Sequence, residues 1–223
     1  MGKVRQGITN PVTGKVGNLV FSSWKGIPYV KTKPAVVHNP RTPQQQSGRK
    51  AFAVIQGLVA GLPDLVRAGF AARAFQQSAY NAAISHNLTN AVVVEGNSRT
   101  VNFRALTFSL GTYAPVTDCV VASADEEIIV RWNPAVIPGV IAGHSNDPVG
   151  IIVVSGQRNR PLWLPDAARR ADGQFIFSLP VEWSGSRIYV WTVTRSATLK
   201  SRPEASVSSS VYAGETGGSS LSA

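Results

Sequence analysis

The sequence predicts an α+β protein: a basic N-terminal arm with a β-hairpin, then two or three helices, then an antiparallel β-sandwich. Three observations predict this order. Residues 1–50 contain cations and no acid, residues 42–91 show the apolar spacing of helices, and residues from 101 onward alternate apolar and polar side chains. The 43% hydrophobic content of the 223 residues is enough to build a substantial core.

The first 37 residues predict an extended arm that leads into a hairpin. Residues 1–17 are rich in Gly, Thr, Asn and Pro, without an apolar period, and favour turns at Asn10-Pro11 and Thr13-Gly14. The β-type runs 17–23 and 27–33 flank Trp24-Lys25-Gly26, which is typical of a tight turn. Pro28 has no N–H to donate, so the second strand is expected at an edge. Two strands alone are marginally stable in water, so the hairpin must pack on the helices or on another subunit.

Residues 38–100 predict a helical region that begins at a clear start signal. Thr42 is a good N-cap, Pro43 suits the first helical position, and Gln45 completes a capping box. Gly61 and Pro63 end this helix. A second helix is expected over 63–74 and a third over 78–91. The predicted apolar stripes are Phe52, Ile55, Leu58, Val59 and Leu62 on the first helix, and Tyr80, Ile84, Leu88 and Ala91 on the third.

Residues 101–213 predict a β-sandwich domain, and residues 214–223, rich in Gly and Ser, predict a flexible tail. Ile128, Val130 and Trp132 are expected to face the core. In the run 187–195, the face with Tyr189, Trp191 and Val193 is the expected core face. Residues 138–146 and Arg169-Arg170 are expected at loop tips. The expected strands are 101–110, 116–122, 127–132, 149–156, 174–180, 187–195 and 206–211.

The net charge of +10 is concentrated in one half of the chain. Residues 1–110 carry 13 Lys and Arg against Asp64 and Glu95, a net +11, whereas residues 111–223 carry a net −1. Such a segment favours contact with an anionic partner or an acidic neighbour; the alternative is a solvated face that aids solubility. The candidate contact residues are Lys3, Arg5, Lys15, Lys25, Lys31, Lys33, Arg41, Arg49 and Lys50, with the aromatic side chains Trp24 and Tyr29.

No catalytic, metal or cofactor signature is present, so we expect no enzyme activity and no cofactor. The histidines His38, His86 and His144 lie far apart, without a metal ligand at short spacing. The single cysteine, Cys119, excludes an internal disulfide and is expected to be a small buried group, because Asp118 disfavours a thiolate. The segment 143–147 brings Ser, His and Asp together in sequence, but catalytic triads are assembled from separated elements.

Several short motifs resemble an uncharacterised domain family of bacterial and phage-borne proteins. They are the segments 14–18, 24–26, 79–81 and 211–212, together with Asn39-Pro40-Arg41-Thr42 followed by Gln44-Gln45. The N-P-R-T-x-Q-Q signature is the most specific part, and similar segments in small phage structural proteins raise the expectation of a virion component. The C-terminal half separately resembles fibronectin type III or immunoglobulin-like modules, through its strand pattern and early tryptophan.

These observations favour a self-associating structural protein, a phage capsid or other particle component whose basic arm contacts subunits or the genome. An arm that cannot fold on itself acquires a role when a neighbouring subunit supplies the missing surface. No apolar run approaches the ~20 residues of a membrane helix. The N-terminus lacks the apolar core of a secretion signal, so we expect cytoplasmic synthesis and presence in a released virion.

Two alternatives stay open. The first is an accessory protein that binds single-stranded nucleic acid; if about six arm cations met phosphates, affinity would fall with salt at a log–log slope of roughly −5. The second is a carbohydrate or surface-binding module, motivated by Trp163 and Trp183 on loops expected to be exposed.

Overall fold

The structure, a computed structural model, describes residues 13–24, 27–36, 39–124, 127–136, 143–183, 185–197 and 206–216. It divides into two compact units, residues 1–42 and 43–223. Three α-helices and several antiparallel sheets make the protein α+β, as predicted.

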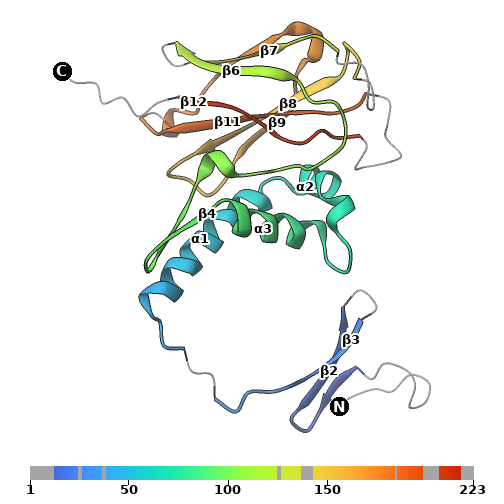
Figure 1. The fold of residues 1–223 in the computed structure, drawn as a ribbon, viewed down its shortest axis with the longest axis vertical. Helices are drawn as coiled ribbons and strands as arrows, with labels where there is room; N and C mark the ends of the chain where they lie inside the picture. Colours follow the sequence, from blue (N-terminus) through green and yellow to red (C-terminus); the bar gives the residue numbers. More distant parts are fainter. Residues whose placement is uncertain are drawn as a thin grey trace, which may run out of the picture. The chain divides into compact units, whose positions relative to one another are not determined.

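The N-terminal unit contains a three-stranded antiparallel sheet in the order β1-β2-β3 (Figure 1). The strands are β1 (Gly14–Val16), β2 (Leu19–Trp24) and β3 (Ile27–Thr32), so the predicted hairpin is confirmed as β2 and β3. The prediction that residues 14–16 belong to an extended arm is wrong. Gly17, with φ +56°, supplies the left-handed backbone that turns β1 back onto β2. Among the described residues, β3 pairs only with β2, which places Pro28 in an edge strand as expected.

The predicted turns at Asn10-Pro11 and at Lys25-Gly26 lie outside the described residues, as do Lys3, Arg5 and His38. The predicted turn at Thr13-Gly14 is replaced by the start of β1. The two residues that connect β1 to β2 are instead Gly17 and Asn18, four positions further along the chain.

Three helices begin the second unit, close to the predicted positions. α1 (Pro43–Ala60) starts at Pro43, and α3 (Ala79–Asn90) starts after Ser78, whose Oγ accepts a hydrogen bond from the Asn81 N–H. The predicted second helix is shorter than expected: α2 (Pro63–Gly69) gives way to a single 3-10 turn, η1 (Ala71–Arg73). In α1 the predicted burial of Phe52 is wrong, because the stripe that faces the core runs through Ala51, Ile55, Leu58 and Val59.

A small hairpin follows α3 where the sequence predicted a longer strand over 101–110. β4 (Val92–Glu95) and β5 (Ser98–Val101) pair through a turn at Gly96, with φ +57°, and a 3-10 turn, η2 (Phe103–Ala105), comes next. The hairpin was not predicted because three consecutive valines (92–94) and the polar residues 98–100 show no alternation of apolar and polar side chains.

Two antiparallel sheets form the rest of the unit. One has the order β10-β7-β6 and the other β12-β11-β8-β9. The 3-10 turns η3 and η4 and the strand β9 were not predicted. Pro165 and Asp166 interrupt the alternating pattern of β9. The bounds are β6 (Thr117–Ala124), β7 (Glu127–Asn133), β8 (Pro148–Ser155), β9 (Leu162–Arg169), η3 (Arg170–Asp172), β10 (Gln174–Ser178), η4 (Val181–Trp183), β11 (Ile188–Thr194) and β12 (Val211–Thr216).

In the second unit, the four-stranded sheet is the middle of three layers. It lies between the helices and the sheet β10-β7-β6 (Figure 1). β8 is buried along its whole length, because successive side chains enter different cores. Ile152 and Val154 pack with the helices, whereas Ile151 and Val153 pack with the inner face of β7. Ile128, Val130 and Trp132 face that second core, as predicted.

The same alternation extends the expectation for β11. The face with Tyr189, Trp191 and Val193 was predicted to be the core face, and it does enter a core, the one under the helices. Ile188 and Val190, on the opposite face, line the space between the two sheets. Both faces of β11 are therefore core faces.

Several loop expectations are wrong for one reason, which is that polar or aromatic residues near turns pack inward. Arg170, predicted at a loop tip, is fully buried. Trp183 is 7% exposed in the sandwich core, and Trp163 is half-buried in β9 over Gly150. At the C-terminal end, Gly214–Thr216 of the predicted tail belong to β12, and residues 217–223 lie outside the described part of the chain.

Candidate functional site

The register of the N-terminal sheet sorts its side chains into two chemically different faces. Residues directly opposite each other in antiparallel strands share a face, and neighbours along a strand alternate. Val20 of β2 lies opposite both Lys15 of β1 and Lys31 of β3, whereas Leu19 lies opposite Val16 and Thr32. The two rows therefore point to opposite sides of the sheet.

One side, which we call the cationic face, combines lysines with aromatic and apolar side chains. The row Lys15, Val20 and Lys31 is followed by the pair Ser22 and Tyr29 and by the pair Trp24 and Ile27. Trp24 is 52% exposed and Tyr29 is 43% exposed, and both lysines are exposed. Lys33 continues the alternation beyond β3, and its N–H donates to the carbonyl of Asn18 at 2.8 Å.

The other side, which we call the apolar face, is made by Val16, Leu19, Phe21 and Val30. Val16 is 53% exposed, Leu19 40% and Val30 54%, and Phe21 is half-buried. Contiguous exposed apolar side chains of this kind mark interaction surfaces more often than isolated ones. The sequence predicted the cations of this segment but not the apolar face. The signal for that face is the alternation of side chains along residues 19–24 and 27–32, once the two strands are paired.

None of the remaining predicted contact residues belongs to the strands of this sheet. Arg41 precedes α1 and has a left-handed backbone, φ +51°, which is uncommon for a residue other than Gly. Arg49 and Lys50 are exposed on α1, in the second unit. Lys25 belongs, with Lys3 and Arg5, to the residues that the structure does not describe.

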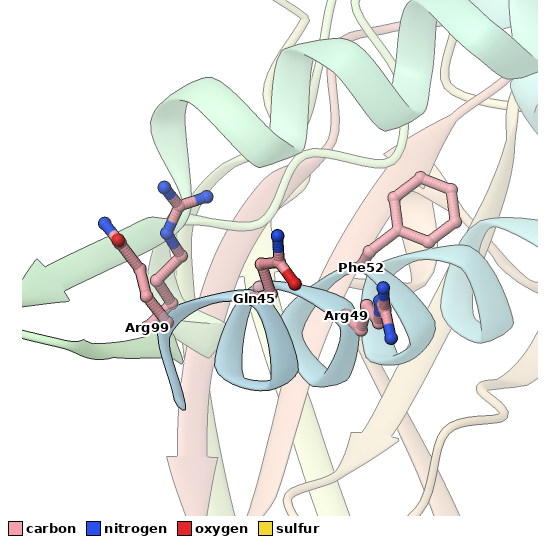
Figure 2. Close-up of a pocket in the computed structure, with 6 residues that line it drawn as sticks. Gln45, Arg49, Phe52 and Arg99 are labelled. Atoms are coloured by element: carbon pink, nitrogen blue, oxygen red, sulfur yellow. The ribbon is translucent and has the colours of Figure 1, made fainter. Parts of the chain in front are cut away.

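A shallow depression along the first turns of α1 forms a second cationic location (Figure 2). Figure 2 shows Gln45, Arg49 and Phe52 following one another along α1, with Arg99 of β5 beside the helix start. Phe52 is 42% exposed there. The described residues that line it include no acid; they are Gln44, Gln45, Gly48, Arg49, Phe52 and Arg99.

Arg99 is held at this depression by its own backbone. The Arg99 N–H donates to Oγ of Ser47, and the Ser47 hydroxyl lies 3.4 Å from the Arg99 carbonyl. The side chain then passes over Gly48, where a Cβ would meet the guanidinium at 3.5 Å. This docking of β5 on α1 brings Arg99 to the depression that Arg49 also lines, although the two residues are 50 positions apart in the sequence, and no sequence pattern predicted it.

The Asp of the segment 143–147 has a structural role. Asp147, from the Ser-His-Asp segment, is fully buried and accepts hydrogen bonds from Tyr113 Oη at 2.7 Å and from the His144 N–H at 2.6 Å. Burial lowers the pKa of His86, with Arg73 adding to the effect. Burial also raises the pKa of Cys119, to which Asp118 contributes, in line with the expected inert thiol. Among the described residues, no three His, Cys, Asp or Glu gather as metal ligands would.

No single helix in the described part of the chain is long and apolar enough to cross a membrane. Only α1 and α2 together reach that length and composition; they are bent by 93° at their junction, and their buried side chains belong to the core beneath the four-stranded sheet.

Fold and site together define a class: an α+β protein with a three-layered C-terminal unit and an N-terminal sheet that has one apolar and one cationic face. Residues 11–214 match the profile of a family of unknown function, DUF6266, and the chain belongs to that family. The match covers both units. Comparison with curated proteins and with solved structures returned no match.

Proposed function

We propose that this chain is a non-enzymatic structural protein that associates with copies of itself, as a component of a phage virion or a similar particle. The observation that carries the proposal is the exposed apolar face of the N-terminal sheet. The resemblance of the N-P-R-T-x-Q-Q segment to small phage structural proteins supports the choice of a virion. A second copy of the chain is the proposed occupant of the apolar face, with the two sheets stacked face to face.

The energetics of this contact favour an assembly of many copies over a tight dimer. Full burial of a Val or Leu side chain stabilises by about 1.5 to 3 kcal/mol, and about half of that remains for side chains that are already half-buried. Val16, Leu19 and Val30 from each of two copies then contribute roughly 6 kcal/mol. Association costs an estimated 4 to 15 kcal/mol in lost freedom, so one such contact is weak by itself. Several weak contacts acting together hold a particle.

We further infer that residues 117–216 form a module of the fibronectin type III or immunoglobulin-like kind. Seven antiparallel strands support this inference, with the first, second and fifth in one sheet and the others in the second sheet. The chain crosses between the sheets after β7, after β9 and after β10. Such crossings are typical of these sandwiches. The carbohydrate-binding alternative loses its motivation, because Trp183 is buried and the Trp163 ring packs on Gly150.

Sedimentation velocity over a wide concentration range tests the proposal on the full chain. We expect the average mass of the wild type to rise with concentration, and the double variant Leu19→Ser/Val30→Ser to remain monomeric. The matched control is Lys15→Gln/Lys31→Gln, on the opposite face of the same strands, which should associate like the wild type. A wild type that stays monomeric at every concentration would overturn the proposal.

A further inference from the structure

We propose that the cationic face of the N-terminal sheet binds single-stranded nucleic acid. The inference goes beyond self-association, since it assigns a different ligand to the opposite face of the sheet, and it does not depend on the proposed dimer contact.

Charge is the first argument. Residues 1–42 contain no Asp or Glu, so the exposed lysines of this face have no acidic neighbour within their own unit. Lys15 and Lys31 flank Val20 on one row, and Lys33 follows at the same end of the sheet. Adjacent strands lie about 4.8 Å apart, so the two row lysines stand roughly 10 Å from each other. A polyanion that runs across the strands neutralises both cations at once.

The aromatic side chains make the second argument, and they select the strandedness of the ligand. Tyr29 and Trp24 follow the lysine row on the same face, at successive positions along the sheet, and each exposes about half of its surface. An exposed aromatic side chain offers a flat surface on which an unpaired base can stack, and every base has such a surface. Bases in a duplex are already stacked on each other. The arrangement of lysines at one end and aromatic rings at the other therefore fits a single strand, with phosphates on the first and bases on the second.

A purely solvated face explains the lysines but not their neighbours. Solubility is served by charged side chains alone, whereas Trp24, Ile27 and Tyr29 each leave 40% or more of their surface in water beside those charges. A protein partner would be expected to match the lysines with acidic side chains. Residues 111–223 of a second copy carry a net charge of only −1, so this chain does not supply a strongly acidic surface for them.

Fluorescence anisotropy with labelled oligothymidylate and oligouridylate, and with a duplex of the same length, tests the proposal on the full chain. We expect both single strands to bind more tightly than the duplex, and the two probes together show whether DNA or RNA is preferred. The affinity should fall with salt at a log–log slope of about −2 if only the three described lysines meet phosphates. It should approach −4 if Lys3, Arg5 and Lys25 join them.

Four variants separate this face from the rest of the molecule. Trp24→Ala and Tyr29→Ala should each weaken binding by about 5- to 150-fold, the range expected for loss of one stacked base. Lys15→Gln/Lys31→Gln removes two charges and leaves polar side chains at two exposed positions, so its expected reduction of the salt slope by about 1.4 does not arise from unfolding. Lys50→Gln, on an exposed cation of α1, is the matched control and should change the affinity little.

Three outcomes would overturn the inference. They are failure of both single strands to bind, equal affinity for duplex and single strand with no effect of the aromatic variants, and binding that the Lys15→Gln/Lys31→Gln variant leaves unchanged. The variant Leu19→Ser/Val30→Ser distinguishes this proposal from the self-association proposal: if it abolishes association but still binds the oligonucleotide, each face acts by itself.

Discussion

The guanidinium of Arg170 and the carboxylate of Asp147 meet in the interior of the second unit, with Nε 3.8 Å from Oδ2 and neither side chain exposed. The Arg170 Nη atoms donate to the carbonyls of Ala114 and Pro115, at 2.6 and 3.0 Å, and its carbonyl accepts from Nε1 of Trp132. The buried charge pair connects the residue before β8 to the end of β9, and the hydrogen bonds of the Arg170 Nη atoms add the loop before β6.

Removal of one partner should destabilise the protein strongly. Asp147→Asn leaves the Arg170 charge buried with carbonyl partners only, and we expect the free energy of unfolding to fall by roughly 3 to 5 kcal/mol in urea titrations. Asp166→Asn is the control, because it breaks the exposed pair between Asp166 and Arg195 and should cost at most about 1 kcal/mol. Equal losses in the two variants would show that burial does not set the strength of the Asp147 contact.

Acid should remove the contribution of Glu215 to stability. Hydrogen bonds from Arg104 lower the pKa of Glu215 to about 2, and Tyr212 Oη also donates to this carboxylate, at 3.1 Å. Because the folded-state pKa is depressed, the stabilisation is complete above the usual pKa of about 4.5 and is lost as the pH falls toward 2. We expect Glu215→Gln to lower Tm at pH 6 and to leave it unchanged near pH 2. A Tm difference that is the same at both pH values would contradict the assignment.

Gly150 should not tolerate a side chain, because Trp163 occupies the space. A Cβ at Gly150 would lie 2.3 Å from Cη2 of the Trp163 ring and 3.0 Å from the Pro165 carbonyl oxygen. We expect Gly150→Ala to destabilise by about 1 to 3 kcal/mol in thermal or urea unfolding. Gly156→Ala is the control at the other end of β8: its Cβ would have no neighbour closer than 3.6 Å, so the change should be small. A stable Gly150→Ala protein would mean that the Trp163 ring is free to move.

Arg41 allows its side chain and its backbone to be tested separately. A left-handed backbone costs a residue other than Gly roughly 1 to 2 kcal/mol, and Arg41→Gly removes that cost while Arg41→Ala keeps it. We expect both variants to fold and both to associate more weakly in sedimentation experiments, because both lack the guanidinium. Weaker association in the Ala variant alone would place the effect in the backbone, and unfolding of the Ala variant would show that the side chain supports the fold.

Local signals in the sequence predicted much of the fold. Pro43 marked the start of α1, Ser78 marked the start of α3, and the alternation of Ile128, Val130 and Trp132 gave the inner face of β7. These features depend on neighbours within a few residues, and such neighbours are visible in the chain itself.

What the sequence did not predict depends on packing between distant segments. Phe52 was assigned to the buried stripe because Ala51, the true core residue, gives a weaker apolar signal. Arg170 was expected in solvent because Asp147, 23 positions earlier, becomes its partner only after β8 and β9 pair. At the site, the candidate cations were predicted as one set. Their division between the cationic face and α1 follows from strand register and from the two-unit organisation.

Thiol cross-linking at a single pair of neighbouring residues tests the central claim, contact between copies through the apolar face, most directly. Val30 and Lys31 are adjacent in β3 and lie on opposite faces of the sheet. In a Cys119→Ser background, Val30→Cys and Lys31→Cys would each be treated with a bifunctional maleimide that spans the roughly 10 Å between stacked sheets. We predict covalent dimers from Val30→Cys and monomers from Lys31→Cys on denaturing gels. Dimers from Lys31→Cys alone would contradict the claim. Absence of dimers from both variants, at concentrations where the wild type associates, would contradict it as well.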